Sequence, residues 1–519
     1  MPKWLENIVF YEIYPQSFLD TNADGIGDLQ GVIRKLDYIK ELGCDGIWLN
    51  PCFESPFFDA GYDVSNYKKV APRYGTNEDL RELFAQAHKR GMRVILDLVP
   101  GHTSIEHAWF KESCRAQKNE YTDRYVWTDS IWEDFKDVGS VSGSVRGFYE
   151  RCGSCAVNFF SIQPALNYGF AKIDREWMQP VDAPGPLATR EAMKDVMRFW
   201  MSMGCDGFRV DMAGSLVKND EGQEATIRLW QDFRRFMDEE FPDCAIISEW
   251  GDPGRSLRGG FHMDFLLHFG PSHYLDLFRV EEPYFSRRGK GDISEFVAKY
   301  RADYEATNRM GLMCIPSGNH DMERMRRTLD EEEMKIAFAF LLSVPGAPFI
   351  YYGDEIGMRY LEDLPSVEGG YHRTGSRTPM QWDTTANAGF SSAEPQDLYI
   401  QIDPDEARPT VESERTNPGG IYQEVKKLIA LRKEHEALQS LAHLEFVYAE
   451  KETYPFVYKR MGKEEDILVI LNPSGEEAVC RIPVQEAGEV IYENNGAASL
   501  KDGELRVPGA SVTFFSYKK

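Results

Sequence analysis

The sequence predicts an α/β fold, in which a (β/α)8 barrel carries an inserted subdomain after its third strand and is followed by an antiparallel β-sandwich domain. Three observations lead to this prediction. Short apolar segments alternate with amphipathic, helix-like segments between residues 8 and 438. Within that range, residues 102–187 are aromatic, glycine-rich and polar and show no regular alternation. After Leu438 the apolar residues recur with period two, which is typical of strands.

The alternating part contains eight candidate strands. Strands that alternate with helices form a parallel sheet with right-handed crossovers, and about eight repeats favour closure of the sheet into a barrel. An open, doubly wound sheet is the alternative. It would need a glycine-rich phosphate loop after the first strand, where residues 11–18 read YEIYPQSF. The candidate strands are residues 8–14, 46–50, 93–99, 207–211, 245–249, 263–269, 313–316 and 348–352.

The helices are predicted from apolar stripes and from their end signals. Leu29, Val32, Leu36 and Ile39 form one stripe with helical spacing. Gly43 then precedes the next strand, as expected of a residue that ends a helix. The remaining helices follow the same pattern, so each candidate strand except the last is linked to the next by at least one helix.

These patterns divide the chain into three parts. Residues 1–103 and 175–438 form the predicted barrel, and residues 104–174 form a loop-rich insertion. Residues 439–519 form the predicted all-β domain. Its clearest period-two strands are residues 467–471 and 512–517.

The composition excludes several classes of function. The 519 residues include 84 Asp and Glu against 59 Lys and Arg, a net charge of −25, which opposes binding to nucleic acid or to an anionic membrane surface. No apolar run reaches the roughly 20 residues that a membrane-spanning helix needs. The first residues, MPKWLENIVFYEIYP, lack the pattern of a secretory signal. We therefore predict a cytoplasmic protein with a small ligand, whose oligomeric state the sequence does not specify.

Nine cysteines are scattered along the chain. Their odd number argues against a disulfide framework. Cys152 and Cys155 form a CxxC motif in a polar loop, but a structural zinc site would need a second pair of ligands, and none is evident.

Acidic residues stand at the ends of several candidate strands. In a barrel, the C-terminal ends of the strands converge on one face. Asp97, Asp211 and Glu249 lie at three of these ends, and Asp321 follows the seventh strand. A single acid at such a position is usually a helix cap or an ion-pair partner. Four converging acids would repel one another, which favours a catalytic role.

Two of these acids suit the cleavage of a glycosidic bond. The reaction passes through an oxocarbenium-like state, in which one carboxylic acid protonates the leaving oxygen and a carboxylate supports or attacks the anomeric carbon. Arg209 lies two residues before Asp211, so both side chains point to the same side of the strand. The cation is expected to keep Asp211 ionised, while Glu249 would have to start the reaction protonated.

The loop at residues 20–28, DTNADGIGD, independently predicts a metal site. Its oxygen-bearing residues alternate around a turn-forming glycine, as in the first part of an EF-hand loop, and hard oxygen ligands suit Ca²⁺. The alternative is a polar turn that caps the following helix. We predict a structural Ca²⁺ ion, with Mg²⁺ as the other candidate. The ligands would be Asp20, Asn22, Asp24 and Asp28, with the main-chain carbonyl of Ile26.

Four motifs give the chain a resemblance to a known family. DLVPGH at 97–102, GFRVDM at 207–212, SEW at 248–250 and SGNHD at 317–321 match, in this order, the signature blocks of the α-amylase superfamily, glycoside hydrolase family thirteen. The sequence most resembles the branch of oligo-1,6-glucosidases, α-glucosidases and trehalose synthases, along essentially its whole length. The resemblance implies a TIM barrel whose insertion is domain B, with QPALN at 163–167 as a fifth block.

The resemblance also implies roles for individual residues. Asp211 would be the nucleophile, Glu249 the acid/base, and Asp321 the carboxylate that grips sugar hydroxyls. Tyr62 would stack beneath the nonreducing glucose, and Phe160 would form a wall of the site. The other implied contacts are Asp63, His102, Arg209 and His320 around the glucose, and Arg324 and Arg377 at the entrance.

Several positions depart from the family pattern. Gly101 replaces the Asn with which many α-amylases bind a calcium ion between domains A and B. Gly214 stands where endo-acting amylases usually have a Lys, which favours an exo-acting enzyme. Met212, next to the proposed nucleophile, leaves the linkage preference open. Outside the motifs, we expect His262 and His268 to be core imidazoles.

These observations predict a retaining, exo-acting α-glucosidase that cleaves short oligosaccharides through a covalent intermediate on Asp211. A transglycosylase or isomerase of the trehalose synthase type is one alternative, because it would pass the same intermediate to a sugar instead of water. An α-amylase that cuts long chains internally is another. A non-catalytic, amylase-like transporter subunit would lack the carboxylates and would carry a membrane segment.

Overall fold

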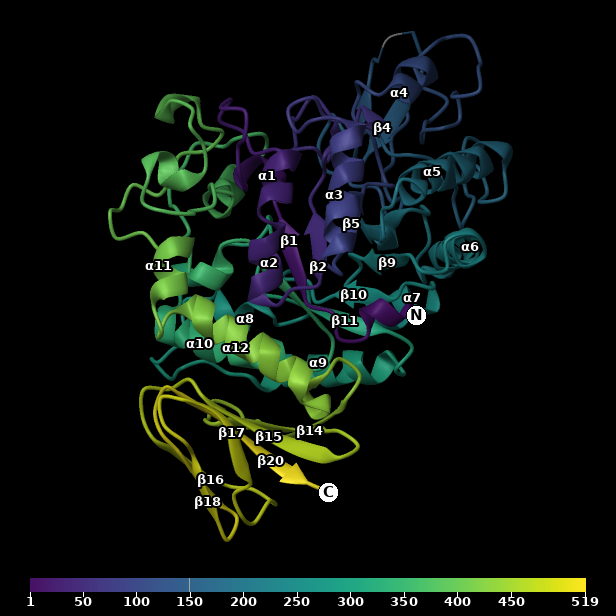
Figure 1. The fold of residues 1–519 in the computed structure, drawn as a ribbon. Coiled ribbons are helices and arrows are strands. Elements are labelled where there is room, and N and C mark those ends of the chain that lie inside the picture. Colours follow the sequence, from purple (N-terminus) through teal and green to yellow (C-terminus); the bar gives the residue numbers. More distant parts are fainter. Residues whose placement is uncertain (149) are drawn as a thin grey trace.

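A closed barrel of eight parallel strands forms the centre of the protein, and a smaller β domain lies against it (Figure 1). The structure is a computed structural model that describes residues 1–148 and 150–519. Pairing of Phe10 with both Phe349 and Gly46 closes the barrel. The barrel strands are β1 (Phe10–Ile13), β2 (Gly46–Leu49), β5 (Arg93–Leu98), β8 (Gly207–Val210), β9 (Ala245–Ser248), β10 (Met263–Phe265), β11 (Leu312–Pro316) and β12 (Ala347–Tyr351).

The eight predicted barrel strands are confirmed, with one clear difference in length. β10 ends at Phe265, whereas the sequence predicted a strand at residues 263–269. The apolar residues 266–269 leave the ladder and form a loop instead, in which Leu266 is buried and Phe269 is exposed. This difference changes which side chains reach the mouth of the barrel.

Helices surround the barrel and begin and end where their sequences indicate. The side chain of Thr76 caps α3 in a capping box with Asp79, and Gly43 ends α2 with a φ of 109° that glycine adopts readily. The predicted stripe at Leu29–Ile39 is divided at Lys35 into two helices. The helices around the barrel are α1 (Leu29–Arg34), α2 (Leu36–Leu42), α3 (Asn77–Lys89), α5 (Pro184–Ser202), α6 (Glu224–Glu240), α7 (Pro253–Arg258), α8 (Leu275–Phe278), α9 (Ser294–Ala306), α10 (Glu331–Ser343), α11 (Val411–Thr416) and α12 (Ile421–Glu434).

Two long connections project from the same end of the barrel and lie on opposite sides of it in Figure 1. The first follows β5 and contains α4 (Ala108–Ser113) and the antiparallel pair β6 (Gly143–Arg146) and β7 (Ser154–Val157). The second follows β12 and contains the short 3-10 helix η6 (Tyr371–Ser376). Because both connections leave the C-terminal ends of barrel strands, they stand above the predicted site.

The hairpin after β2 also reaches this end of the barrel. It consists of β3 (Phe53–Glu54) and β4 (Asn66–Val70), which pair antiparallel. The tip of the hairpin carries residues 59–62, where Ala60 and Gly61 both adopt positive φ angles of 50° and 101°. This tight turn brings Asp59 next to Tyr62, whose N–H donates to the carbonyl of Asp59 at 2.9 Å.

The C-terminal domain is an antiparallel sandwich, as predicted. One sheet has the order β13-β14-β15-β20-β17 and the other the order β16-β19-β18. Their facing side chains form a separate apolar cluster that includes Leu468, Phe515 and Leu505. The strands are β13 (His443–Tyr448), β14 (Phe456–Met461), β15 (Glu465–Asn472), β16 (Ala478–Arg481), β17 (Glu489–Asn494), β18 (Ser499–Lys501), β19 (Glu504–Val507) and β20 (Ser511–Lys518).

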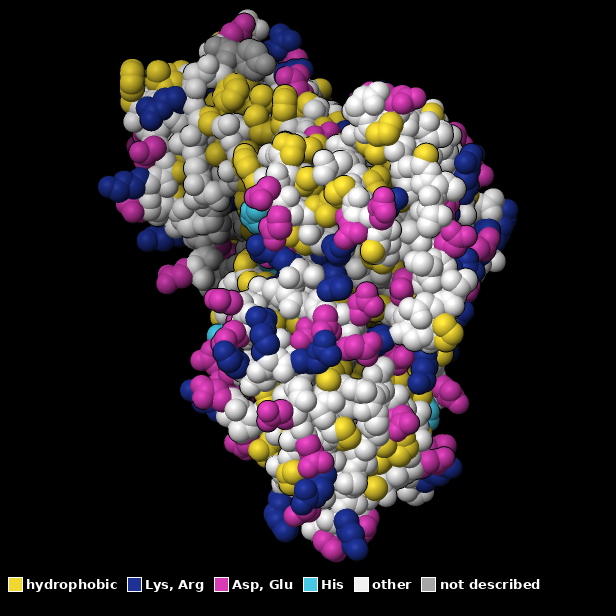
Figure 2. All heavy atoms as spheres, turned by 90° about the vertical axis from the view of Figure 1, so that its left-hand side faces the viewer, with side chains coloured by type: hydrophobic (Ala, Val, Ile, Leu, Met, Phe, Trp, Pro, Cys, Tyr) yellow, Lys and Arg dark blue, Asp and Glu magenta, His cyan; other side chains and the backbone are white. Residues whose placement is uncertain are grey.

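The surface and the cysteines agree with the reading of the composition. Figure 2 shows acidic and basic side chains interspersed on one face of the molecule. All nine cysteines, each in the part of the chain that the structure describes, are free thiols. None of the helices formed by the described residues is both long and apolar enough to cross a membrane.

Candidate active site

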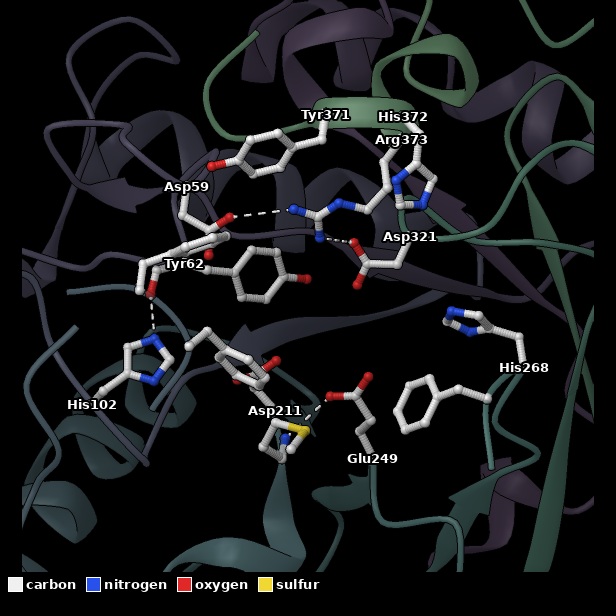
Figure 3. A pocket seen from close by; sticks show the side chains of 14 residues that line it. Asp59, Tyr62, His102, Asp211, Glu249, His268, Asp321, Tyr371, His372 and Arg373 are labelled. Carbon is white, nitrogen blue, oxygen red and sulfur yellow. Dashed lines mark hydrogen bonds and ion pairs between the residues drawn. The ribbon is translucent and has the colours of Figure 1, made fainter. Parts of the chain in front are cut away.

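A cavity of about 520 Å³ opens at the C-terminal end of the barrel, between the two long connections (Figure 3). Its volume falls within the ~300–1,000 Å³ of typical small-molecule sites. The floor carries acidic side chains from the strand ends, and the rim carries aromatic side chains from the loops. The lining residues are Asp59, Tyr62, His102, Phe159, Phe160, Asp211, Met212, Glu249, His268, Phe269, Asp321, Tyr371, His372 and Arg373.

One arginine holds the acidic floor together. Arg209, on β8, is only 2% exposed, and its Nη1 lies 2.8 Å from Oδ1 of Asp97 and 3.0 Å from Oδ1 of Asp211. Its Nη2 lies 2.8 Å from Oε2 of Glu249. The expectation that Arg209 and Asp211 share one side of the strand agrees with this contact. The same cation also holds Glu249, so two carboxyl groups face the cavity around one guanidinium.

The electrostatics of Asp211 differ from the sequence-based expectation. Burial raises the pKa of Asp211 well above its usual value, and the nearby Glu249 carboxylate raises it further, while Arg209 only partly offsets both effects. The cation therefore does not by itself keep Asp211 ionised, because desolvation and a second carboxyl group act against it.

Tyr62 forms one wall of the cavity and is fixed by two histidines. Its hydroxyl lies 2.7 Å from Nε2 of His320, and the two rings stack with centroids 5.2 Å apart. Nε2 of His102 lies 2.9 Å from the carbonyl oxygen of Tyr62. His102 faces the cavity, whereas His320 stands behind Tyr62, with Nδ1 2.9 Å from Oε1 of Glu12. Burial lowers the pKa of His102 to about 4, so its imidazole is neutral at neutral pH.

Asp321 is held by two arginines. Nη1 of Arg373 lies 2.6 Å from Oδ1 of Asp321, and Nη2 of Arg377 lies 3.0 Å from the same oxygen. Burial alone would raise the pKa of Asp321, but the imidazole of His320 and the two guanidinium groups outweigh it and hold that pKa well below the usual value. Arg373 also approaches Asp59, with Nη2 3.7 Å from its Oδ1.

Asp63, for which the sequence predicted a contact with the substrate, is not among the residues that line the cavity. Its carboxylate is turned into its own loop, where it accepts from Ser55 Oγ at 2.9 Å, from the N–H of Phe58 at 2.9 Å and from the N–H of Asp59 at 3.1 Å. Because these three donors occupy the carboxylate of Asp63, it does not face the cavity. The acid of this loop that lines the cavity is Asp59, four residues earlier. No motif in the sequence had indicated Asp59, which reaches the cavity through the tight turn at residues 59–62.

The predicted entrance arginines also lie elsewhere. Arg324 is buried away from the cavity, where Nη1 donates to the carbonyl of Tyr352 at 2.8 Å and contacts Asp354 at 3.0 Å. Arg377 is buried behind Asp321 and donates to the carbonyl of His320 at 2.7 Å. Arg373 is the arginine that lines the cavity. Arg373 lies within η6, whose first residues line the cavity, whereas Arg377 follows the end of this helix and points behind Asp321.

The rim is largely aromatic. Phe159, Phe269 and Tyr371 are 52%, 47% and 57% exposed, respectively. Phe160 lines the cavity as predicted and faces Tyr371 across the mouth, with ring centroids 6.1 Å apart. Exposed rings of this size suit stacking on the apolar faces of sugars, and no single sequence motif had indicated the set as a whole.

Of the two histidines that were expected in the core, His262 lies there and His268 does not. His262 is buried, and its Nδ1 accepts from the N–H of Ile246 at 3.1 Å, as expected of a core imidazole. His268 instead lines the cavity (Figure 3). The sequence placed it inside a strand, but β10 ends three residues earlier. Had that strand end been recognised, the convergence of strand ends would have placed His268 at the site.

The loop at residues 20–28 has the oxygen groups that a hard cation needs. Oδ1 of Asp20 accepts from the N–H of Asn22 at 2.9 Å, and Oδ1 of Asp24 accepts from that of Ile26 at 2.9 Å. Asp28 caps α1 by accepting from the N–H of Gly31 at 2.7 Å. The side chains of Asn22 and Asp24 are exposed. The helix cap and several oxygen-bearing side chains therefore occur together in this loop. In the described part of the chain, however, the carboxylates of Asp20, Asp24 and Asp28 do not form a group whose oxygens all lie within 4.8 Å of one another.

A barrel whose strand ends converge on two carboxyl groups, beneath a cavity rimmed by aromatic rings, defines a carbohydrate-cleaving class of protein. Residues 12–440 match the family described as alpha amylase, catalytic domain. The chain belongs to this family of glycoside hydrolases.

Relatives with several activities are similar to the whole chain. An oligo-1,6-glucosidase of Parageobacillus thermoglucosidasius is 30% identical and is matched over 97% of both chains. A trehalose synthase/amylase of Mycolicibacterium smegmatis is 33% identical over 84% of this chain and 77% of its own length. The isomaltulose synthase structure from Erwinia rhapontici NX5 aligns over 100% of both chains, with a TM-score of 0.82 and 27% identity. These names leave the specific activity of this chain open.

Proposed function

We propose that the protein is a retaining, exo-acting α-glucosidase that releases glucose from short oligosaccharides. The observation that carries the reaction type is the contact of Asp211 and Glu249 with the same guanidinium of Arg209, at the floor of the cavity. Two carboxyl groups on one cavity face are the machinery that glycoside cleavage needs. Tyr62, His102 and Asp321 line the cavity and would hold the glucose.

The two carboxyl groups would act in turn. Glu249 donates its proton to the glycosidic oxygen while Asp211 attacks the anomeric carbon, which gives a covalent glucosyl-Asp211 intermediate and frees the second sugar. Glu249 then takes a proton from water, and the resulting hydroxide displaces Asp211 from the anomeric carbon. The N–H of Met212 lies 3.1 Å from Oε2 of Glu249 and supports the position of that carboxylate between the two steps.

Arg373 supports the exo-acting part of the proposal. It contacts both Asp321 and Asp59, and Asp59 in turn accepts from Nε2 of Gln163 in the inserted connection at 2.7 Å. This chain of contacts closes one side of the cavity between the barrel loops and the insertion. A long glucan would have to pass through it to be cut internally, so the geometry favours the end of a chain over its interior.

A transglycosylase or isomerase is the second candidate. The rim above Asp211 is apolar, with Met212, Phe159, Phe160, Phe269 and Tyr371 around the place where a second sugar would lie. An apolar rim disfavours water as the acceptor of the glucosyl group. Two of the similar proteins are named a trehalose synthase/amylase and an isomaltulose synthase, and these names also support this second candidate.

The first prediction concerns the nucleophile. Asp211→Asn removes the attacking carboxylate while it keeps the shape of the side chain, so kcat on p-nitrophenyl α-D-glucoside should fall about 10⁴-fold or more. Thermal unfolding should show that the variant remains folded. A folded variant that keeps more than about a tenth of the activity would contradict the proposed role.

The second prediction concerns the products. Chromatography after reaction with maltose, isomaltose, sucrose, trehalose and panose should show release of single glucose units, formed first as the α-anomer. A ladder of internal fragments from starch would refute exo action. Disaccharide isomers in place of glucose would assign the chain to the transglycosylase or isomerase class.

We also infer a structural Ca²⁺ ion in the loop at residues 20–28, with Mg²⁺ as the alternative. The residue types of this loop support the inference, since Asp20, Asn22, Asp24 and Asp28 supply hard oxygen ligands at alternating positions. The ion would hold the loop and the start of α1 together and would take no part in the reaction.

A further inference from the structure

His268 lines the cavity and has a buried ring nitrogen that the protein itself leaves unpaired. Its Nδ1 is buried and has no hydrogen-bond partner among the described residues. By contrast, His262 accepts a main-chain hydrogen bond, and both ring nitrogens of His320 are engaged. An unpaired buried nitrogen costs free energy, so a ligand that pairs with the ring gains more than it would from a satisfied one.

The position of His268 relates it to the second sugar rather than to the glucose. Figure 3 shows the ring directed into the cavity on the side of Glu249, across from His102. Tyr62 and His102 belong to the proposed glucose end, whereas Glu249 would protonate the oxygen that joins glucose to its neighbour. The ring of Phe269 stands nearly perpendicular to that of His268, at 84° with centroids 5.0 Å apart. The aromatic face of Phe269 and the hydrogen-bonding edge of His268 therefore lie next to each other, beyond Glu249.

The charges around His268 favour a neutral partner. Burial lowers the pKa of His268, so the ring offers one donor and one acceptor rather than a positive charge. The nearby acids Glu249 and Asp321 add negative charge to the cavity. Arg373, the arginine that lines it, is already paired with Asp321. A phosphorylated second sugar would find no unpaired cation here and would be repelled by the carboxylates.

We propose that His268 and Phe269 form the subsite for the second sugar and that His268 selects a neutral saccharide by hydrogen-bonding one of its hydroxyl groups. This inference rests on the proposed function, because it places the second sugar beyond Glu249. It assigns a specificity-determining role to a residue outside the four family motifs, on a loop that the sequence pattern had read as a strand.

The test compares substrates that differ only in the leaving group. α-D-Glucosyl fluoride carries a glucose but no second sugar, so His268→Ala should change its hydrolysis less than about twofold. The same variant should lose about tenfold in kcat/KM on the best disaccharide of the panel, which corresponds to about one hydrogen bond. His268→Gln, which keeps a donor and an acceptor, should recover part of that loss. His273→Ala, five residues further on and outside the cavity, is the matched control and should show no such difference.

Each result decides between the alternatives. An equal loss on the fluoride and on the disaccharide would mean that His268 supports the fold or the glucose end, and would overturn the inference. An unchanged disaccharide activity would overturn it as well. A disaccharide phosphorylated on its second ring should react at least tenfold more slowly than the unmodified sugar, and equal rates would refute the neutral-saccharide part. If the wild-type protein fails to hydrolyse the fluoride, the proposed function fails together with this inference.

Discussion

Glu249 is positioned by a buried acid on the neighbouring strand. Oδ1 of Asp264, on β10, accepts from Oγ of Ser248 at 2.7 Å and from the N–H of Trp250 at 3.0 Å. These two residues stand immediately before and after Glu249, so Asp264 fixes the main chain on both sides of the proposed acid/base. Burial raises the pKa of Asp264 to about 7, with its hydrogen bonds acting against that rise.

This raised pKa predicts a pH-dependent contribution to stability. In the unfolded chain the carboxyl group would have a pKa of about 3.9, so the folded protein binds the proton more tightly. Stability from this group is complete below about pH 4 and is lost as the pH rises to about 7. Asp264→Asn removes this titration. The Tm of the wild type minus that of the variant should therefore fall between pH 4 and pH 7, as measured by calorimetry.

The control for this prediction is the pH range above the titration of Asp264. Between pH 8 and pH 9 the difference in Tm should be constant, whatever its sign, because Asp264 is then ionised in both states. A difference that stays flat from pH 4 to pH 8 would show that Asp264 does not carry the proton expected from its burial.

Residue identities explain which parts of the site could be predicted. Asp211, Glu249 and Arg209 follow from strand ends and from the two-residue period of a strand, both of which are local properties. Asp59 and Arg373 do not, because their positions depend on turns that bring side chains back over the cavity. The carboxylate of Asp63 accepts from the N–H of Phe58 within its own loop and does not reach the cavity.

At the scale of elements, the loop at residues 20–28 gives a testable metal prediction. A bound ion adds its binding free energy to the stability of the folded protein. Dialysis against a chelator should therefore lower the Tm, and addition of Ca²⁺ should restore it. Asp24→Ala removes an exposed carboxylate that does not cap α1, so it should abolish the Ca²⁺ response without the loss of the helix cap.

Two outcomes would change this assignment. Full restoration by Mg²⁺ at equal concentration would point to the smaller ion. A Tm that responds to neither ion would leave the loop as a polar turn that caps α1 through Asp28. The sequence already allowed this polar turn as the alternative, since the same residues can either bind a metal ion or cap the helix.

The end of β10 is the element boundary that the sequence pattern predicted least well. The strand prediction at residues 263–269 was too long, because Leu266 and Leu267 are as apolar as a strand interior although they belong to a loop. An apolar residue buried under a loop has the same pattern as one buried in a sheet. The predicted strand was only a few residues too long, but for this reason His268 was expected in the core, whereas it lines the cavity.

At the scale of the whole molecule, a buried arginine of the sandwich binds the end of a barrel helix, next to a second buried arginine that belongs to the barrel itself. Arg460, on β14, donates to the main-chain carbonyls of Ser343 and, at 2.6 Å, of Gln439. Arg432, on α12, donates to the carbonyls of Leu342 and Val344, each at 2.9 Å. The carbonyls of Leu342, Ser343 and Val344 lie at and just beyond the C-terminal end of α10, where main-chain oxygens lack partners within the helix.

This arrangement predicts that Arg460 couples the two domains. Arg460→Met keeps much of the apolar volume but leaves buried carbonyls without donors, which should cost about 2–3 kcal/mol in the free energy of unfolding. The variant should have a lower Tm and faster proteolysis near residues 439–442. Arg481→Met, in the exposed sheet of the sandwich, is the matched control and should leave both unchanged. Equal effects of the two substitutions would contradict this role.

The sequence by itself determined the barrel, the sandwich, the family and the proposed catalytic pair, because each depends on periodicity or on short motifs at strand ends. The tertiary structure decided which of several nearby acids, arginines and histidines reach the cavity. That choice depends on how the hairpin tip, the loop after β10 and η6 fold back over the barrel mouth. Contacts between segments far apart in the chain set those paths, so no local pattern encodes them.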